Sequence, residues 1–235
     1  MLESRERVEE LMDRADADPE ELRSALAFIR RINVLLGYTR ATLHHLKRFS
    51  RSWKAGERIT ILDLATGSAD IPRAILKWAR RSGFDLHVTG LDLHPTTASA
   101  ALAENPDPSL IIVRGDALHP PFADGSFDYV LTNMFLHHLD EAEVVQVMRE
   151  MNRLACRGVI IADLLRHRRA YFWIRIFSAF AGRIVRHDAP ASVAQAFVKR
   201  EILDLRDQAE IPYAAYFRHF GHRFVLAGCK PHHKT

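Results

Sequence analysis

The sequence predicts an α/β protein with a Rossmann-like, doubly wound sheet that is mainly parallel and ends in a C-terminal antiparallel β-hairpin, plus an N-terminal helical cap. From Ile59 to Leu164 short apolar runs alternate with helical patterns, which implies parallel strands joined by right-handed crossovers. The last two strand-like runs lie too close together for a crossover helix and must pair antiparallel. With 48% hydrophobic residues among 235, the chain can bury one sizeable core.

Residues 1–50 are expected to form the helical cap. A short charged helix is predicted over residues 3–16. Asp18-Pro19-Glu20-Glu21 combines an N-cap, a proline at the first helical position and acids in the first turn, which is typical of a helix start. Apolar residues from Leu22 to Leu36 recur with helical period, Gly37 ends that helix, and a second helix follows from Tyr38 to about Phe49.

Residues 51–235 are expected to form the ligand-binding domain. Five parallel strands are predicted at residues 59–65, 87–93, 110–116, 127–134 and 157–164. Crossover helices are predicted at 71–83, 95–105 and 140–155, and hairpin strands at 214–220 and 222–229. A helical lid insert is expected at about 165–200, and Ser192 is taken as the N-cap of the helix that leads to the hairpin.

An acidic residue ends each of the first three predicted strands: Asp63, Asp92 and Asp116. In open α/β sheets the ligand binds beyond the carboxyl ends of the strands. A dinucleotide site needs several glycines at the first turn, but ILDLATGSADIP has Gly67 alone, and Asp70 would repel a pyrophosphate. The pattern therefore disfavours NAD.

S-adenosylmethionine (SAM) suits these residues better because it has no phosphate. A carboxylate after the second strand can accept both ribose hydroxyl protons, and one after the third can accept from the adenine amino group. The small-residue turn after the first strand admits the amino-acid end, whose ammonium and sulfonium charges favour nearby acids.

The stretches ILDLATGSAD, VTGLDLHP, GDALHPPFADGSFDYV and TNMFLHHLD resemble, in order and spacing, the motifs of class I SAM-dependent methyltransferases, in particular the ubiquinone/menaquinone C-methyltransferase-like group. The resemblance covers about residues 59–164 and the terminal hairpin, and it implies a small-molecule substrate and S-adenosylhomocysteine as product. The cofactor-binding residues that it implies are Asp63, Ala65, Thr66, Gly67, Asp92, Leu93, Asp116, Ala117 and Asn133. Family members often have glycine where this chain has Ala65 and Ala69, and alanine narrows such a turn.

His137 is the candidate catalytic residue, a general base for a substrate hydroxyl, whereas His138 is interpreted as packing against the next helix. No metal is expected, because His44-His45 and His232-His233 are adjacent pairs without the spacing of a metal site.

The segment 166–186 alternates aromatic residues with arginines. It is interpreted first as a lid helix whose apolar face packs on the cap and whose arginines face water. A roof over a hydrophobic, aromatic substrate, built jointly with residues 20–50, is one alternative. Docking to an acidic carrier protein, contact with a membrane surface and a homodimer interface stay open as alternatives.

The predicted function is SAM-dependent methyl transfer to an oxygen or carbon of a hydrophobic, aromatic, quinone-like or polyketide-like small molecule. The rivals are an rRNA or tRNA methyltransferase, disfavoured because no base-flipping motif or catalytic cysteine follows the fourth strand, and a non-catalytic SAM-binding scaffold. Two unrelated cysteines and a polar N-terminus without an apolar leader favour a cytoplasmic location.

Overall fold

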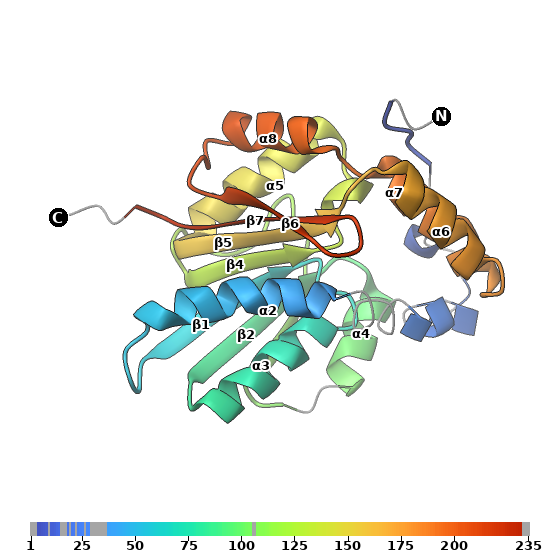
Figure 1. The fold of residues 1–235 in the computed structure, drawn as a ribbon. Coiled ribbons are helices and arrows are strands. Elements are labelled where there is room, and N and C mark those ends of the chain that lie inside the picture. The colour runs from blue at the N-terminus through green and yellow to red at the C-terminus, as the bar shows by residue number, and fades with distance from the viewer. Residues whose placement is uncertain are drawn as a thin grey trace.

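The computed structural model describes residues 4–8, 10–14, 18, 20–21, 23–25, 27–28, 37–104 and 107–231. Its centre is one seven-stranded sheet with helices on both faces (Figure 1). The strands are β1 (Arg58–Leu64), β2 (Asp85–Asp92), β3 (Leu110–Arg114), β4 (Phe127–Asn133), β5 (Ala155–Leu164), β6 (Ala215–His219) and β7 (Arg223–Cys229).

The strand order is β3-β2-β1-β4-β5-β7-β6. The first five strands pair in parallel, whereas β7 pairs antiparallel with both β5 and β6. The order reverses between β1 and β4, so the carboxyl ends of these two strands form the switch point where such sheets bind ligands. The predicted fold class is confirmed.

Successive side chains along each strand point to opposite faces of the sheet, so the hydrophobic core has two layers. On one face, Leu62 and Val130 pack against α5 (Glu141–Leu154) and α8 (Lys199–Gln208). On the other face, Ile61 and Leu131 pack with the second core layer. That layer includes residues of α2 (Tyr38–Phe49) and α3 (Asp70–Ser82). The helix α4 (Pro95–Glu104) packs beside β2 and β3.

The residues predicted to form the N-terminal cap lie at two different places in the structure. The helix α2 has the predicted bounds and packs against the sheet at β5 and β7, with Leu46 and Phe49 in the core. Described residues before it lie against residues 181–195, and the described residues within 20–28 are helical. The predictions for Leu22, Leu26 and residues 29–36, and for His232-His233, fall outside the described residues.

The prediction of a helix over residues 3–16 is wrong: the described residues there form only a 3-10 helix, η1 (Leu11–Asp13). Contacts with distant residues replace the local helical hydrogen bonds. The Asp188 carboxylate accepts from the backbone N–H groups of Leu11 (2.8 Å) and Met12 (2.9 Å). The Arg5 side chain donates to the backbone carbonyls of Gln195 (2.5 Å) and His137 (3.0 Å).

The insert after β5 consists of two packed helices, α6 (Arg168–Ser178) and α7 (Arg183–Gln195), which project beyond one end of the sheet (Figure 1). Ser192 is not the N-cap of the next helix, because it lies in the last turn of α7 and its hydroxyl donates to the Asp188 carbonyl (2.9 Å). The following helix, α8, begins after Val198. Within the described residues, no helix combines the length and apolarity needed to cross a bilayer.

Candidate active site

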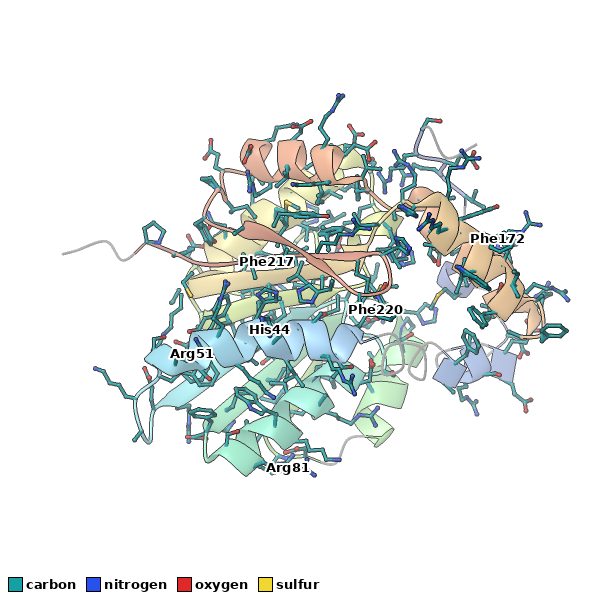
Figure 2. All side chains as sticks on the ribbon, in the orientation of Figure 1. His44, Arg51, Arg81, Phe172, Phe217 and Phe220 are labelled. Atoms are coloured by element: carbon teal, nitrogen blue, oxygen red, sulfur yellow. The ribbon has the colours of Figure 1, made fainter. Side chains whose placement is uncertain are left out.

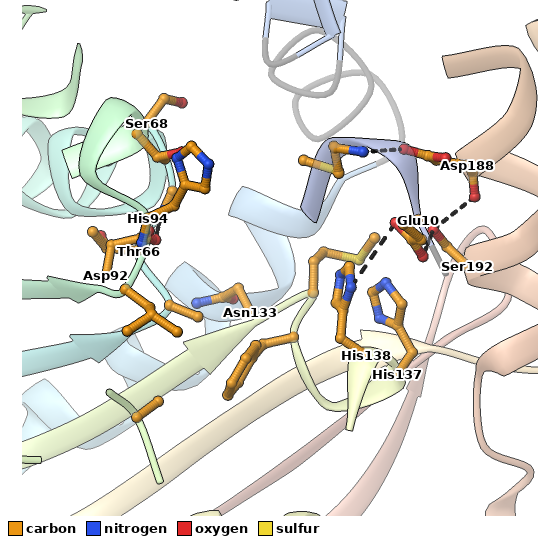
Figure 3. A pocket seen from close by; sticks show the side chains of 18 of the residues that line it. Glu10, Thr66, Ser68, Asp92, His94, Asn133, His137, His138, Asp188 and Ser192 are labelled. Atoms are coloured by element: carbon orange, nitrogen blue, oxygen red, sulfur yellow. Dashed lines mark hydrogen bonds and ion pairs between the residues drawn. The ribbon is translucent and has the colours of Figure 1, made fainter. Parts of the chain in front are cut away.

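A cavity of about 540 Å³ lies at the carboxyl ends of the parallel strands. All ten predicted site residues line it: Asp63, Ala65, Thr66, Gly67, Asp92, Leu93, Asp116, Ala117, Asn133 and His137. Figure 3 shows its polar side chains in two groups, one around Thr66 and Asp92 and the other around His137 and Glu10, with Asn133 between them. The cavity therefore has two chemically distinct ends.

The turn after β1 is held in an unusual backbone shape. Ala65, Gly67 and Ala69 all have positive φ, at 53°, 57° and 56°. Left-handed geometry costs an alanine about 1 kcal/mol or more, so the surrounding contacts must impose it. The Gly67 N–H donates to the Asp92 carboxylate (2.8 Å) and the Thr66 N–H to the Leu91 carbonyl (3.0 Å), which tie the turn to β2.

Gly90 on β2 allows this close approach. A Cβ atom at that position would lie 2.8 Å from the Thr66 side chain, closer than carbon atoms tolerate. The Thr66 hydroxyl in turn donates to Asp63 (2.7 Å). Because Gly90 has no side chain, Thr66 can lie close to β2, where its hydroxyl group orients the Asp63 carboxylate.

Asp63 is a buried acid, only 2% exposed, and it lines the end of the cavity that contains Thr66 and Asp92. Burial raises the pKa of its carboxyl group to about 7, and the nearby Asp70 adds to the rise, although hydrogen bonds from Thr66 and Asn133 oppose it. A cationic ligand would favour the ionised form of this group. The site is thus prepared for an ammonium or a sulfonium rather than for a phosphate.

Asp92 and Asp116 order the two neighbouring loops. The Asp92 carboxylate also accepts from the His94 N–H (3.0 Å), and the Asp116 carboxylate accepts from the Leu118 N–H (2.8 Å). An ionised carboxylate has about four acceptor sites, so a carboxylate can accept from a ligand hydroxyl or amino group as well as from a backbone N–H. Both acids are thereby fixed at the rim of one cavity.

Asn133 joins the two ends of the cavity. Its amide nitrogen donates to Asp63 (3.4 Å), and its amide oxygen accepts from the Thr42 hydroxyl on α2 (2.5 Å). The next residue, Met134, has a φ of 55°, a strained conformation for a non-glycine residue. The chain turns sharply here and directs η3 (Leu136–His138) toward the second end.

His137 forms a buried pair with Asp163 at the end of β5. Its Nδ1 lies 2.7 Å from one Asp163 carboxylate oxygen, and its backbone N–H donates to the other oxygen (3.1 Å). Burial alone would raise the pKa of Asp163, but the interactions with His137 and the Leu164 N–H outweigh it and lower that pKa. The ionised acid orients a proton on Nδ1, so a neutral His137 ring has Nε2 as its acceptor.

A third polar group near His137 was not predicted from the sequence. Glu10 is buried and accepts from Ser192 (2.7 Å) and Gln195 (3.0 Å), and its carboxylate lies 3.9 Å from His138 Nδ1. Glu10, His137 and His138 offer ligand atoms within 4.8 Å of one another. Two imidazoles and a carboxylate are a donor set that suits a divalent cation. The expectation of no metal rested on histidine spacing and did not anticipate Glu10.

Tyr38 and Arg223 were also missed, although both line the cavity. Each is 1% exposed, and the Arg223 guanidinium lies 3.4 Å from the centre of the Tyr38 ring. Burial lowers the pKa of Arg223 and raises that of Tyr38. A cation held over a ring at a cavity wall can attract an electron-rich oxygen of a bound molecule.

The sequence matches the family described as a methyltransferase domain over residues 62–162. It is 33% identical to the demethylmenaquinone methyltransferase of Roseiflexus sp. (strain RS-1) over 103 residues, which are 44% of this chain and 41% of that protein. It is 26% identical to the demethylmenaquinone methyltransferase of Lysinibacillus sphaericus (strain C3-41), over 68% of this chain and 62% of that protein. The chain thus spans about half the length of the curated relatives it matches.

The fold is also similar to that of a SAM dependent methyltransferase from Aquifex aeolicus, with a TM-score of 0.63 at 15% identity over 90% of this chain and 98% of that one. Residues 62–162 thus match a methyltransferase domain, and the fold is similar to that of a SAM dependent methyltransferase. The predicted resemblance to methyltransferases is confirmed, and SAM is the cofactor that this resemblance implies.

Proposed function

We propose that the protein transfers a methyl group from SAM to a hydroxylated aromatic small molecule of quinol type. The observation that carries this proposal is the continuity of the cavity, which runs from the acids after β1–β3 to the His137–Asp163 pair. The wall of the second end is largely apolar. It includes Met12, Phe28, Leu139, Ile174, Ile184, Val185 and Val193.

The end of the cavity around Thr66 and Asp92 would bind the cofactor, and we call it the cofactor end; the end around His137 and Glu10 is the acceptor end. Asp92, with Leu93 beside it, would accept from the ribose hydroxyls, and Asp116 with Ala117 would meet the adenine. Asp63 and the backbone of Ala65 to Gly67 would hold the amino-acid end, with Asn133 beside the reactive methyl group. SAM bound in this way supplies an electrophilic methyl group, and S-adenosylhomocysteine is the product.

At the acceptor end, His137 would take the proton of a ring hydroxyl on Nε2, while Asp163 holds Nδ1 and stabilises the resulting imidazolium. The phenolate electrons can then attack the methyl group from oxygen or from the adjacent ring carbon, with S-adenosylhomocysteine as the leaving group. After attack from carbon, the hydrogen on that carbon leaves as a proton and the aromatic ring is restored, so deprotonation of the same hydroxyl serves either acceptor. Arg223 would attract the developing oxyanion. The demethylmenaquinone relatives favour carbon as the acceptor in this chain.

The proposal is tested by methyl transfer to a panel of quinols and phenols. We expect His137→Gln and Asp163→Asn to lower kcat by about a hundredfold or more, the range of a lost general base, with S-adenosylhomocysteine affinity unchanged. His87→Gln is the matched control, because His87 lies at the start of β2, away from the cavity.

Other outcomes would contradict the proposal in distinguishable ways. Cofactor binding without turnover on any acceptor would favour a scaffold, and transfer to rRNA or tRNA would favour the nucleic-acid alternative. Loss of activity in EDTA, restored by Zn²⁺, would assign Glu10, His137 and His138 to a metal instead of a base.

A further inference from the structure

The helix α6 presents a stripe of large apolar side chains to solvent. Phe172 and Ile176 lie one turn apart, and Trp173 and Phe177 form the parallel row beside them. Their exposed fractions are 58%, 42%, 53% and 63%, in that order. Such side chains normally face the core of an amphipathic helix, but this helix has its apolar face turned outward. The prediction that this face packs on the N-terminal cap is therefore wrong for these four residues.

The stripe is contiguous. The Trp173 ring contacts those of Phe172 and Phe177, with centroid distances of 5.4 and 6.0 Å. Phe180, two residues after the end of α6, is 94% exposed and continues the apolar surface. Figure 2 shows Phe172 on the part of α6 that projects away from the sheet. A patch of this kind marks an interaction surface rather than scattered surface residues.

The same segment is strongly basic. Residues 164–187 contain six arginines and no acidic residue. One of them, Arg166, is buried and pairs with Glu201, but Arg168, Arg169, Arg175 and Arg186 are exposed. On a helical projection Arg168 and Arg175 lie along one border of the apolar stripe. The surface therefore combines aromatic side chains with a row of fixed positive charges.

We propose that α6 docks on the surface of an anionic lipid bilayer, with its apolar stripe among the acyl chains and its arginines at the headgroup phosphates. Aromatic side chains on one face and arginines beside them are the features of a helix that lies in the interface plane. Charge complementarity favours anionic lipid. A second copy of the chain fits less well, because a two-fold contact would bring these arginines against one another with no acid from the segment to pair them.

The inward side of α6 connects this surface to the cavity. Ile174, on the side opposite the stripe, lines the acceptor end. A docked α6 would therefore lie between the bilayer and the acceptor end of the cavity. On the proposed function, this position suits an acceptor that dissolves in lipid, but the docking itself depends only on α6.

The test is sedimentation of the full chain with vesicles of phosphatidylcholine alone and with a quarter phosphatidylglycerol. We expect binding to the anionic vesicles, weakened by salt, with a blue shift of tryptophan emission. Trp173→Ser with Phe177→Ser should weaken binding about tenfold or more. Ile111→Thr is the matched control, an exposed apolar residue on β3.

The charge contribution is tested separately. Arg168→Gln with Arg175→Gln should weaken binding to anionic vesicles about 25-fold, at about fivefold for each arginine near such a surface. Arg51→Gln with Arg81→Gln is the control, since Figure 2 shows both residues away from α6. S-adenosylhomocysteine affinity of every variant checks that the protein is folded.

Three results would overturn the proposal: no binding of the wild type to anionic vesicles, equal losses in the control variants, or a dimer in solution that the α6 variants dissociate. None of these readouts involves methyl transfer. Failure of docking and failure of the proposed reaction are therefore separately visible.

Discussion

At the scale of single residues, the protonation of Asp63 makes both the stability of the protein and ligand binding depend on pH. Burial raises the pKa of this carboxyl group to about 7, whereas an unfolded aspartate titrates near 3.9. The pKa of Asp63 is higher in the folded protein than in the unfolded chain. Its contribution to the unfolding free energy is therefore fully present below about pH 4 and is lost as the pH rises through about 7. We expect the unfolding free energy of the ligand-free protein, measured relative to Asp63→Asn, to fall by on the order of 2 kcal/mol or more across this window.

The same shift predicts a proton release on binding. A ligand ammonium beside Asp63 would favour the carboxylate, so S-adenosylhomocysteine binding at pH 6.5 should release a fraction of a proton. Calorimetry in two buffers of different ionisation enthalpy measures this fraction. Asp63→Asn should abolish it, and an unchanged release in that variant would show that another group titrates.

Substitutions of Ala65 test whether the left-handed backbone of the turn limits which residues are tolerated at this position. Glycine at φ 53° removes strain of about 1 kcal/mol, but it adds a similar entropy to the unfolded chain. We expect Ala65→Gly to leave the melting temperature and cofactor affinity nearly unchanged, and Ala65→Val to lower both, since a β-branched residue tolerates this geometry poorly. Thermal unfolding and calorimetry check both variants; a well-tolerated valine would contradict the account.

At the scale of elements, the contact between β5 and β7 depends on a glycine. A Cβ at Gly158 would lie 2.4 Å from the Gly228 carbonyl oxygen, an atom of backbone that cannot move aside. We expect Gly158→Ala to cost about 2 kcal/mol or more of unfolding free energy. At Gly182, before α7, a Cβ would meet nothing within 4 Å. Gly182→Ala should change stability by no more than about 0.5 kcal/mol, and equal effects in a denaturant titration would refute the argument.

The elements were predictable where local periodicity encodes them. The alternation of apolar runs predicted where the strands lie along the chain, and the bounds of α2 agree with the structure. The helix expected over 3–16 failed because its hydrogen bonds go to Asp188, 177 positions from Leu11. No local pattern encodes a partner so distant in sequence. Ser192 failed as an N-cap because the helix around it continues to Gln195.

At the scale of the whole molecule, the predicted site residues line one cavity because strand ends converge in a parallel sheet. Asp63, Asp92 and Asp116 needed only that rule to be placed around one cavity. Glu10, Tyr38 and Arg223 could not be found in this way. They reach the cavity from the N-terminal segment, from α2 and from the antiparallel hairpin, whose positions depend on tertiary packing.

The central claim is that this cavity binds SAM and not a dinucleotide. Calorimetric titration with S-adenosylhomocysteine, with NAD as the control, tests it most directly. We predict micromolar binding of the first ligand and none of the second. Asp92→Ala and Asp116→Ala should each weaken S-adenosylhomocysteine binding by roughly ten- to a hundredfold, the loss of a charged hydrogen-bond acceptor. Binding of NAD, or no binding of S-adenosylhomocysteine to the folded wild type, would contradict the account.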